Sequence, residues 1–508
     1  MRRYLVLALA VLTLLGLLSP PALAQAPAPK VTINGLLDFV TQWDKNLQDG
    51  DTTNRETEWW SRQRGRFDFK GEVGKGNVVW GVEMDFANGN TPRAHGGTSA
   101  GFDLDTDVAG VIETKWLYLE FPLTGPGSIL PFIQVPTIAR GGGQPFRNHD
   151  FKLGMLASVG DFGGLNLVTT FSPEIRNIFT FAQIEELNSG REGGFTSNRD
   201  SWAIIDSLEV TPWKGFTVKP TVSYAEFGGN NQGSASLGTT PRGGFNVGAD
   251  RLWRATVGGD LEWKSGPWLL EPTFHYQFGE QRLPVATRAA TGETEADIRA
   301  WIVDIIGGWR SGPLNLQARF TYTSGNDADE CVQTIAGVCR GGSDINYYEP
   351  INPGFGYYAL WTEIWTGVFE YLNAGPSGAS RGRERSIGFD KYGLIAGGVK
   401  ATYSLTPAFS LFGIVQPSWT AEKVDTNGAV TANGITPADA KGDDRYLGTE
   451  IDVGINWSFA PRTTLGVVYG HLFAGEALNQ CIPASASCAR PRDAKDIDTV
   501  AARVRFTF

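Results

Sequence analysis

The chain has 508 residues, of which 41% are hydrophobic and 19% are charged, and its formal net charge at pH 7 is −10. This composition excludes a disordered chain and a helical membrane protein, and the negative charge argues against a nucleic-acid partner. The 64 glycines, 29 phenylalanines and 16 tryptophans suit short strands joined by tight turns, with rings at a lipid–water boundary.

The first 24 residues have the pattern of a secretory signal peptide. Arg2 and Arg3 precede an apolar run over 4–18, and Ala22-Leu23-Ala24 offers a small-x-small cleavage site. A membrane anchor is the weaker alternative, because the run is short and prolines interrupt it. We expect cleavage after Ala24, so residues 25–508 form the exported protein as one domain.

From residue 30 onward, stretches of about ten alternating residues are followed by links that are short and long in turn. The expected short links lie at 73–77, 122–128, 160–164, 211–215, 264–268, 310–314, 405–408 and 460–463. The expected long loops lie near 43–57, 90–110, 138–149, 173–199, 228–250, 279–297, 325–387, 421–445 and 475–497. The pattern predicts an all-β transmembrane antiparallel barrel of about 18 strands in the bacterial outer membrane. Its short turns would be periplasmic and its long loops extracellular.

The second expected strand, "SRQRGRFDFK", carries the strongest candidate for a functional site. Phe67 and Phe69 face lipid in this pattern, so Arg62, Arg64 and Arg66 point into the lumen. Arg503 and Arg505 point inward from the last strand, which closes the barrel beside the first. These five arginines are predicted to form one basic wall that attracts anions. The alternative is that they only pair with Asp38 and Asp68 and stiffen the polar interior.

Alternation also predicts acidic side chains in the lumen. Because the total charge of the chain is negative, a preference for cations over anions stays an open alternative. The predicted pore-lining carboxylates are Asp38, Asp68, Glu83, Asp85, Asp260 and Glu262.

The segment "FDLDTDVAGVIE" places Asp103, Asp105 and Asp107 at alternate positions in an expected extracellular loop. Alternating carboxylates can wrap a Ca²⁺ ion, but the EF-hand spacing fails at Val108 and Glu113. A solvated acidic loop is therefore the favoured interpretation, and no cofactor is expected.

A loop must fold inward if a barrel of this size is to be narrowed. Loop 325–387 is the longest and contains an aromatic stretch at 346–375. It could lie in the lumen, pack at a subunit interface or cap the pore. The segment 172–188 has helix-like spacing and is a second candidate, and 140–150 is a third.

The four cysteines fall in two close pairs, Cys331 with Cys339 and Cys481 with Cys488. In an exported protein each pair is expected to close a disulfide within a loop. A metal site is less favoured, because the spacing is not C-x-x-C and no histidine is near.

The final strand alternates up to Phe506 and Phe508, and the chain is expected to end on it. The signal peptide, the strand–turn rhythm and Phe508 together resemble a Gram-negative outer-membrane porin. The stretches "SRQRGRFDFKGEVGKGNVVWGVEMDF" and "KWLYLEFPL" are similar to early strands of the homotrimeric porins of sulfate-reducing bacteria. The resemblance implies a homotrimer in outer-membrane lipid, and it implies that Phe506 and Phe508 are the assembly signal read by the barrel-insertion machinery.

The sequence therefore predicts a porin that passes small hydrophilic solutes and ions by passive diffusion. One alternative is a substrate-specific channel for anionic saccharides or organic anions, and another is a plugged structural or adhesive surface barrel. An enzyme is not expected, because the four histidines show no nucleophile–base arrangement.

Overall fold

The computed structural model describes most of the expected barrel. The described residues are 30–46, 57–86, 111–146, 161–185, 201–228, 251–282, 292, 294–328, 344–348, 350–351, 362–366, 392–427, 429–431, 434–436, 442–479, 481 and 488–508.

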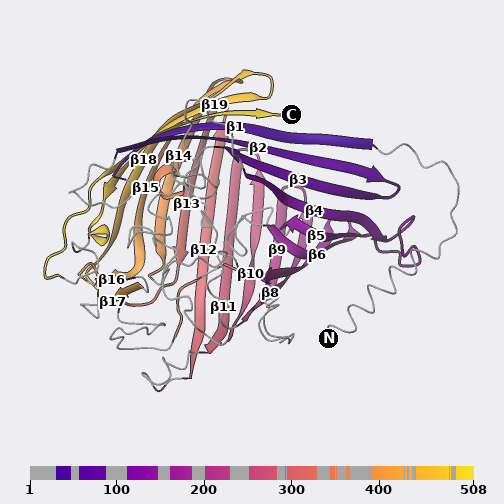
Figure 1. Ribbon diagram of the computed structural model, residues 1–508, viewed down its shortest axis with the longest axis horizontal. Helices are drawn as coiled ribbons and strands as arrows, with labels where there is room; N and C mark the ends of the chain where they lie inside the picture. The colour runs from indigo at the N-terminus through magenta and orange to yellow at the C-terminus, as the bar shows by residue number, and fades with distance from the viewer. Residues whose placement is uncertain are drawn as a thin grey trace.

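Eighteen strands form one antiparallel sheet in which each strand pairs with its neighbours along the chain. The sheet closes into a barrel because β1 also pairs with β20 (Figure 1). The barrel strands are β1 (Lys30–Lys45), β2 (Thr57–Val73), β3 (Gly76–Phe86), β4 (Val111–Thr124), β5 (Thr137–Pro145), β6 (Asp161–Ser172), β7 (Ile175–Glu185), β8 (Ser201–Trp213), β9 (Phe216–Gly228), β10 (Arg251–Ser265), β11 (Trp268–Arg282), β12 (Glu295–Ser311), β13 (Leu314–Thr323), β14 (Leu394–Thr406), β15 (Phe409–Val424), β18 (Asp444–Ala460), β19 (Thr463–Ala474) and β20 (Ile497–Thr507).

Three smaller groups of elements lie in the long connections. A hairpin of β16 (Ala429–Thr431) and β17 (Gly434–Thr436) follows β15. Helix α3 (Glu363–Thr366) lies between β13 and β14, and the 3-10 helix η2 (Glu476–Leu478) follows β19. Among the described residues no helix is long and apolar enough to cross a membrane.

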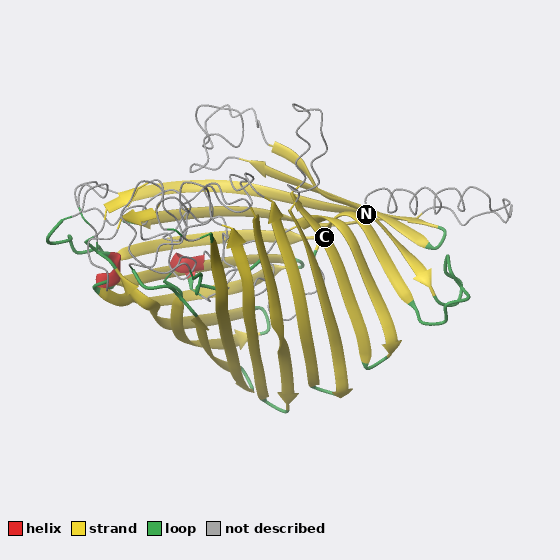
Figure 2. Cartoon of the chain, turned by 90° about the horizontal axis from the view of Figure 1, so that it is seen from below, coloured by secondary structure: helices red, strands yellow, loops and turns green. Residues whose placement is uncertain are grey.

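The connections are sorted by length, as the sequence pattern predicts. Seven of the short ones have two residues each: 74–75, 173–174, 214–215, 266–267, 312–313, 407–408 and 461–462. They lie along one rim, and α3 and η2 lie toward the other end of the barrel (Figure 2). Lys30 pairs with Glu72 and Leu36 pairs with Thr507, so β1 begins and β20 ends on the short-turn side.

Alternation separates an apolar outer face from a polar inner face on most strands. On β1, Val31, Ile33 and Phe39 are 63%, 50% and 43% exposed, whereas Asp38 is 5% exposed. Rings gather on the outer face near both strand ends. Trp213 stacks on Phe216 at the short turns, and Trp202 lies beside Tyr224 near the other end. Such aromatic belts are typical of the two membrane interfaces of a transmembrane barrel.

Phe508 is held where the barrel closes. Its backbone exchanges two hydrogen bonds of 3.0 Å with Gly35, and its ring lies 5.5 Å from the ring of Phe67. A Cβ at position 35 would lie 2.7 Å from the Phe508 ring and 2.3 Å from a backbone oxygen of Arg66. Position 35 therefore requires glycine if Phe508 is to dock.

We expect Gly35→Val to lower the yield of folded barrel strongly, because the added side chain displaces Phe508 from the closing strand pair. Gly71→Val is the matched control, since a Cβ there has its nearest neighbour at 4.0 Å. The folded fraction is measured by the difference in gel mobility between heated and unheated samples. Equal yields for the two variants would contradict this account of closure.

Three expected connections in the first half of the chain are wrong. "GDFGG" (160–164) is not a turn, because β6 runs through it, and much of 138–149 is strand β5 rather than loop. The segment 172–188, expected to be helix-like within a loop over 173–199, is a tight turn followed by β7. The link expected at 122–128 is a longer segment, 125–136. The strand count is unchanged because these shifts compensate.

Candidate pore constriction and charged wall

The predicted basic residues lie on three adjacent strands, β20, β1 and β2. Register places Arg505, Asp38 and Arg64 in one row across these strands. Arg503, Val40 and Arg62 form the next row, and Arg66 lies opposite Glu83 of β3. The structure therefore brings Arg64, Arg66, Arg503 and Arg505 into one sector of the inner wall, which we call the basic sector, and backbone register places position 62 in the same sector.

Buried carboxylates pair with these cations. Arg66 donates to Glu83 through Nε at 2.7 Å, and its Nη2 also contacts this carboxylate. Arg64 and Lys115 lie 3.7 and 3.8 Å from Glu83 Oε1. Glu83 is thus shared by three cations.

Asp38 pairs with the last strand rather than with β2. Arg505 donates to it through both Nε, at 2.6 Å, and Nη2. The alternative in which the arginines pair with carboxylates thus describes real contacts, although the chief partners are Glu83 and Asp38. Asp68 is half-buried on the same inner face.

In three of these four ion pairs the cation is far more exposed to water than the carboxylate, and Arg64 is the exception, since its side chain is only 5% exposed. The side chains of Arg66 and Lys115 are 26% and 25% exposed, whereas that of Glu83 is 3% exposed. Arg505 is 34% exposed and its partner Asp38 is 6% exposed. These three cationic groups therefore face the lumen and the carboxylates lie behind them.

The positions of the other predicted residues say less about ion selectivity. Asp260 and Glu262 share the inner face of β10, where Asp260 accepts from Thr273 at 2.6 Å and Glu262 pairs with Lys264 at 2.6 Å. They lie outside the basic sector. Arg503 is partly buried on its inner row. The side chains of Arg62 and Asp85 lie outside the described part of the structure, as do Asp103, Asp105, Asp107, Cys331 and Cys339.

The connection between β13 and β14 enters the barrel. The backbone N–H groups of α3 donate to inner-wall carboxylates of β18: Glu363 to Asp452 at 3.0 Å, and Ile364 to Glu450 at 2.6 Å. Glu450 and Asp452 are 0% and 1% exposed, and Ile451 between them faces outward at 36%. This end of the connection is therefore anchored to the inner wall.

A second part of the same connection, residues 344–348 and 350–351, is attached to a different part of the wall. Ile345 forms a parallel bridge with Ile298 of β12, and Arg254 of β10 donates to the carbonyl of Pro350 at 3.3 Å. Asn326 fixes the base of the segment, accepting from the N–H of Asn346 at 2.7 Å and donating to Asp344. Two anchors on separate strands hold the connection across the barrel interior.

Apolar side chains complete both attachments. Ile364, Trp365 and Tyr348 belong to a buried cluster with inner-wall residues of β12, β14, β18 and β19. Ile345, Tyr347 and Ile351 belong to a second buried cluster with apolar residues of β6 to β10 and β12. Of the three positions open to loop 325–387, the described residues occupy the lumen. Glu450, Asp452 and Arg254 are not among the predicted site residues, because alternation marks them only as inward and not as anchors.

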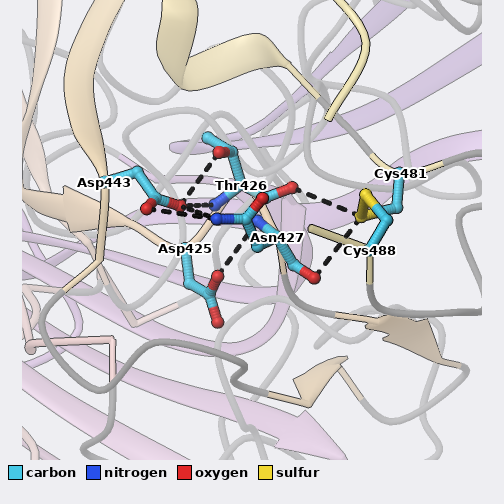
Figure 3. Close-up of a disulfide and its surroundings, with 6 residues drawn as sticks. All are labelled: Asp425, Thr426, Asn427, Asp443, Cys481 and Cys488. Atoms are coloured by element: carbon cyan, nitrogen blue, oxygen red, sulfur yellow. Dashed lines mark hydrogen bonds between the residues drawn. A yellow bond between two sulfur atoms is a disulfide. The ribbon is translucent and has the colours of Figure 1, made fainter. Parts of the chain in front are cut away.

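Cys481 and Cys488 form a disulfide in the connection after β19. The pair contacts the connection after β15: the N–H of Cys488 donates to the carbonyl of Asn427 at 3.3 Å, and the Cys481 sulfur lies 3.4 Å from the same oxygen (Figure 3). Asp443 accepts from the N–H and hydroxyl of Thr426 at 2.8 and 2.9 Å, which shapes that turn. The disulfide lies within the connection after β19, and its contacts with Asn427 hold that connection against the one after β15 at the same rim.

We expect reduction of this disulfide to loosen the rim locally. The disulfide closes a short loop, with a sequence separation of 7 between the two cysteines. Such a bond stabilises the ordered loop by about 2–3 kcal/mol, and reduction removes this stabilisation. Trypsin cleavage after the exposed Arg492 is therefore expected to speed up by about tenfold or more. Barrel unfolding should change little. A cleavage rate that is unaffected by reduction would show that the disulfide does not order this connection.

Comparison with known proteins identifies the family of this chain. The model of the family described as Gram-negative porin matches residues 8–416. The chain belongs to the Gram-negative porin family. This porin is therefore an outer-membrane channel protein built on an 18-stranded barrel.

Solved structures similar to this porin include two outer-membrane proteins of Pseudomonas aeruginosa. OccK8 (OprE) is 12% identical, covers 95% of this chain and 98% of its own, and has a TM-score of 0.48. OccK1 (OpdK) is 10% identical, with coverage of 94% and 98% and a TM-score of 0.48. No curated protein matches the porin.

Proposed function

We propose that this porin is a passive diffusion channel for small hydrophilic solutes and that its basic sector gives the pathway a preference for anions. The observation that carries the proposal is the difference in exposure within the ion pairs. Arg66, Lys115 and Arg505 present partly exposed charges, whereas Glu83 and Asp38 are buried behind them. An ion in the lumen comes closer to these exposed side chains than to the buried carboxylates. The positive charge of the arginine and lysine side chains therefore dominates the local field.

The inward connection supplies the narrowing that selectivity requires. It is anchored on β10, β12 and β18, and its apolar cluster also includes Ile497 at the start of β20. The arginines of the basic sector lie on β2 and farther along β20, at Arg503 and Arg505. We propose that solutes pass between this connection and the basic sector, without a cofactor and without chemical change. An anion there would exchange part of its hydration for guanidinium N–H donors.

The remaining features of the proposal concern biogenesis and assembly. We propose that residues 1–24 are removed as a signal peptide and that Phe506 and Phe508 are read by the barrel-insertion machinery. The early strands resemble the homotrimeric porins of sulfate-reducing bacteria, so a homotrimer is the proposed assembly.

A plugged surface barrel is the second candidate, and one observation favours it. Tyr348, Ile364 and Trp365 of the connection are at most 3% exposed, so this part of the lumen is filled. In that case the rim around Cys481 and Cys488 would be the functional surface. The basic sector argues against a complete plug, since the side chains of Arg66 and Arg505 are 26% and 34% exposed.

Swelling of liposomes that contain the refolded protein tests the proposal. Uncharged sugars and small organic anions of matched size should both enter, with the anions faster. Equal rates would remove the proposed preference, and the absence of swelling with a verified folded barrel would favour the plugged alternative. A rate that saturates with one anion would indicate a substrate-specific channel.

A further inference from the structure

One part of the outer wall does not have the apolar surface that lipid requires. Asp206 lies on the outer face of β8, because its neighbours Ile205 and Ser207 are buried inward and Leu208 is 38% exposed outward. Directly opposite it are Phe179 of β7 and Val222 of β9, the latter 51% exposed. This carboxylate is near the middle of a strand that runs from Ser201 to Trp213.

Asp206 is part of a polar strip that crosses neighbouring strands. Asn177 of β7 donates to it at 2.7 Å. Thr169 of β6 shares a hydroxyl contact of 3.0 Å with Thr137 of β5, which is itself only 8% exposed, so Thr169, Asn177 and Asp206 form the partly exposed section of the strip. Register places Thr137, Thr169 and Asn177 in a single row. A charged or strongly polar group on the lipid-facing surface is destabilising, most of all near the mid-plane, so a strip of this kind suggests that protein covers it.

Glycines on the same sector leave open space in the wall. Gly141 of β5 and Gly163 of β6 face outward, and an added Cβ at either position would have no neighbour within 4 Å. Leu117 and Leu119 of β4 stand beside this gap at 54% and 53% exposure. Small residues on a membrane-facing surface allow another protein to approach closely.

The rim below this sector carries a third, separate feature. Segment 125–136 exposes four apolar side chains: Ile129 at 57%, Phe132 at 74%, Ile133 at 40% and Val135 at 39%. Its backbone is ordered by internal hydrogen bonds, including Gly125 N–H to the Ile133 carbonyl at 2.7 Å. A fixed loop that holds apolar side chains in the open is typical of a contact surface.

We propose that the outer face of β4 to β8, together with segment 125–136, is the surface on which a second copy of this chain packs. Only another membrane-embedded wall can reach this face, and a copy of the barrel offers a matching one. The leucine ridge (Leu117 and Leu119) lies beside the glycine gap, so the ridge of one copy can pack into the gap of the next, which is the head-to-tail contact that a ring of three copies needs. This inference rests on the homotrimer part of the proposed function and identifies its contact surface.

The test measures the oligomeric mass of the detergent-solubilised protein by light scattering, with cross-linking in native outer membranes. The double variant Gly141→Phe/Gly163→Phe fills the gap, and we expect it to shift the protein from several chains to one. Gly307→Phe is the matched control, because Gly307 faces outward on β12, on another side of the barrel, with no atom within 4 Å of its Cβ position. The control should keep the wild-type mass.

A second variant distinguishes loss of the subunit contact from a folding defect in the first variant. Phe132→Glu changes a side chain that is 74% exposed, so it should fold normally and still weaken the assembly. Equal masses for all variants, or a wild-type protein that is a single chain, would overturn the inference. Conductance is recorded on the same samples. A monomeric wild-type that conducts refutes only the contact surface, and an oligomer that depends on the gap but does not conduct refutes only the channel.

Discussion

The double variant Glu450→Ala/Asp452→Ala is expected to release the inward connection and to raise the single-channel conductance. These two side chains accept the N–H groups at the start of α3, and both are buried. A buried donor left without its acceptor costs about 1–3 kcal/mol, so the loss of two acceptors increases the released population by about a hundredfold. The recording should show larger steps and frequent transitions between levels.

The conservative double variant Glu450→Gln/Asp452→Asn separates hydrogen bonding from charge. It keeps an acceptor oxygen at each site, so it should have a smaller effect than the alanine variant. Glu422→Ala is a control, since Glu422 pairs with Arg445 at the rim and is not an anchor of α3. If the alanine variant folded but conducted like the wild type, the connection would not be what narrows the pore.

Opposite changes in ion preference are expected when the two sides of one ion pair are neutralised. Arg66→Ala removes an exposed cation and uncovers Glu83, so the preference for anions should fall or reverse. Glu83→Gln removes the buried carboxylate behind Arg66 and Lys115, so the preference should rise. One unit charge at about 4 Å in water is worth about 1 kcal/mol, which gives about a fivefold change in local ion concentration. The reversal potential under a salt gradient measures both effects.

Arg299→Ala is the matched control for charge alone. Arg299 is 61% exposed and pairs with Asp297 toward the long-loop end of β12, outside the basic sector. Its removal changes the net charge by the same amount as Arg66→Ala and should leave the reversal potential unchanged. Shifts of the same sign for Arg66→Ala and Glu83→Gln would mean that the two side chains influence the pathway only through folding.

The barrel could be predicted because alternation and link length repeat along the whole chain. The predicted connections were wrong where a glycine-rich part of a strand resembled a turn. Gly163 and Gly164 resemble a turn but lie within β6, while the real turn after β6 has no glycine. There the Ser172 hydroxyl accepts the N–H of Glu174 at 3.2 Å and donates to the Glu174 carboxylate at 2.8 Å. The turn also contains Pro173, so a turn signal was present, but the glycine-rich stretch at 160–164 resembled a turn more strongly.

The site was predictable in part, for a similar reason. Alternation places Arg64, Arg66 and Arg505 inward, and closure of the sheet brings them together. The sequence cannot show that Glu83 is shared by several cations, because that depends on side-chain reach across β2, β3 and β4. It also cannot show which wall anchors the inward connection. Glu450 and Asp452 alternate with apolar residues like other inward carboxylates, and only their contact with α3 distinguishes them.

We propose that exposed cations in the basic sector control an open pathway through the barrel. The deciding experiment is to record the refolded protein in a planar bilayer under a KCl gradient. We expect steady conductance steps and a reversal potential of the sign given by chloride preference. Steady steps with potassium preference would contradict the role of Arg66 and Arg505, and a folded barrel without conductance would contradict the channel itself.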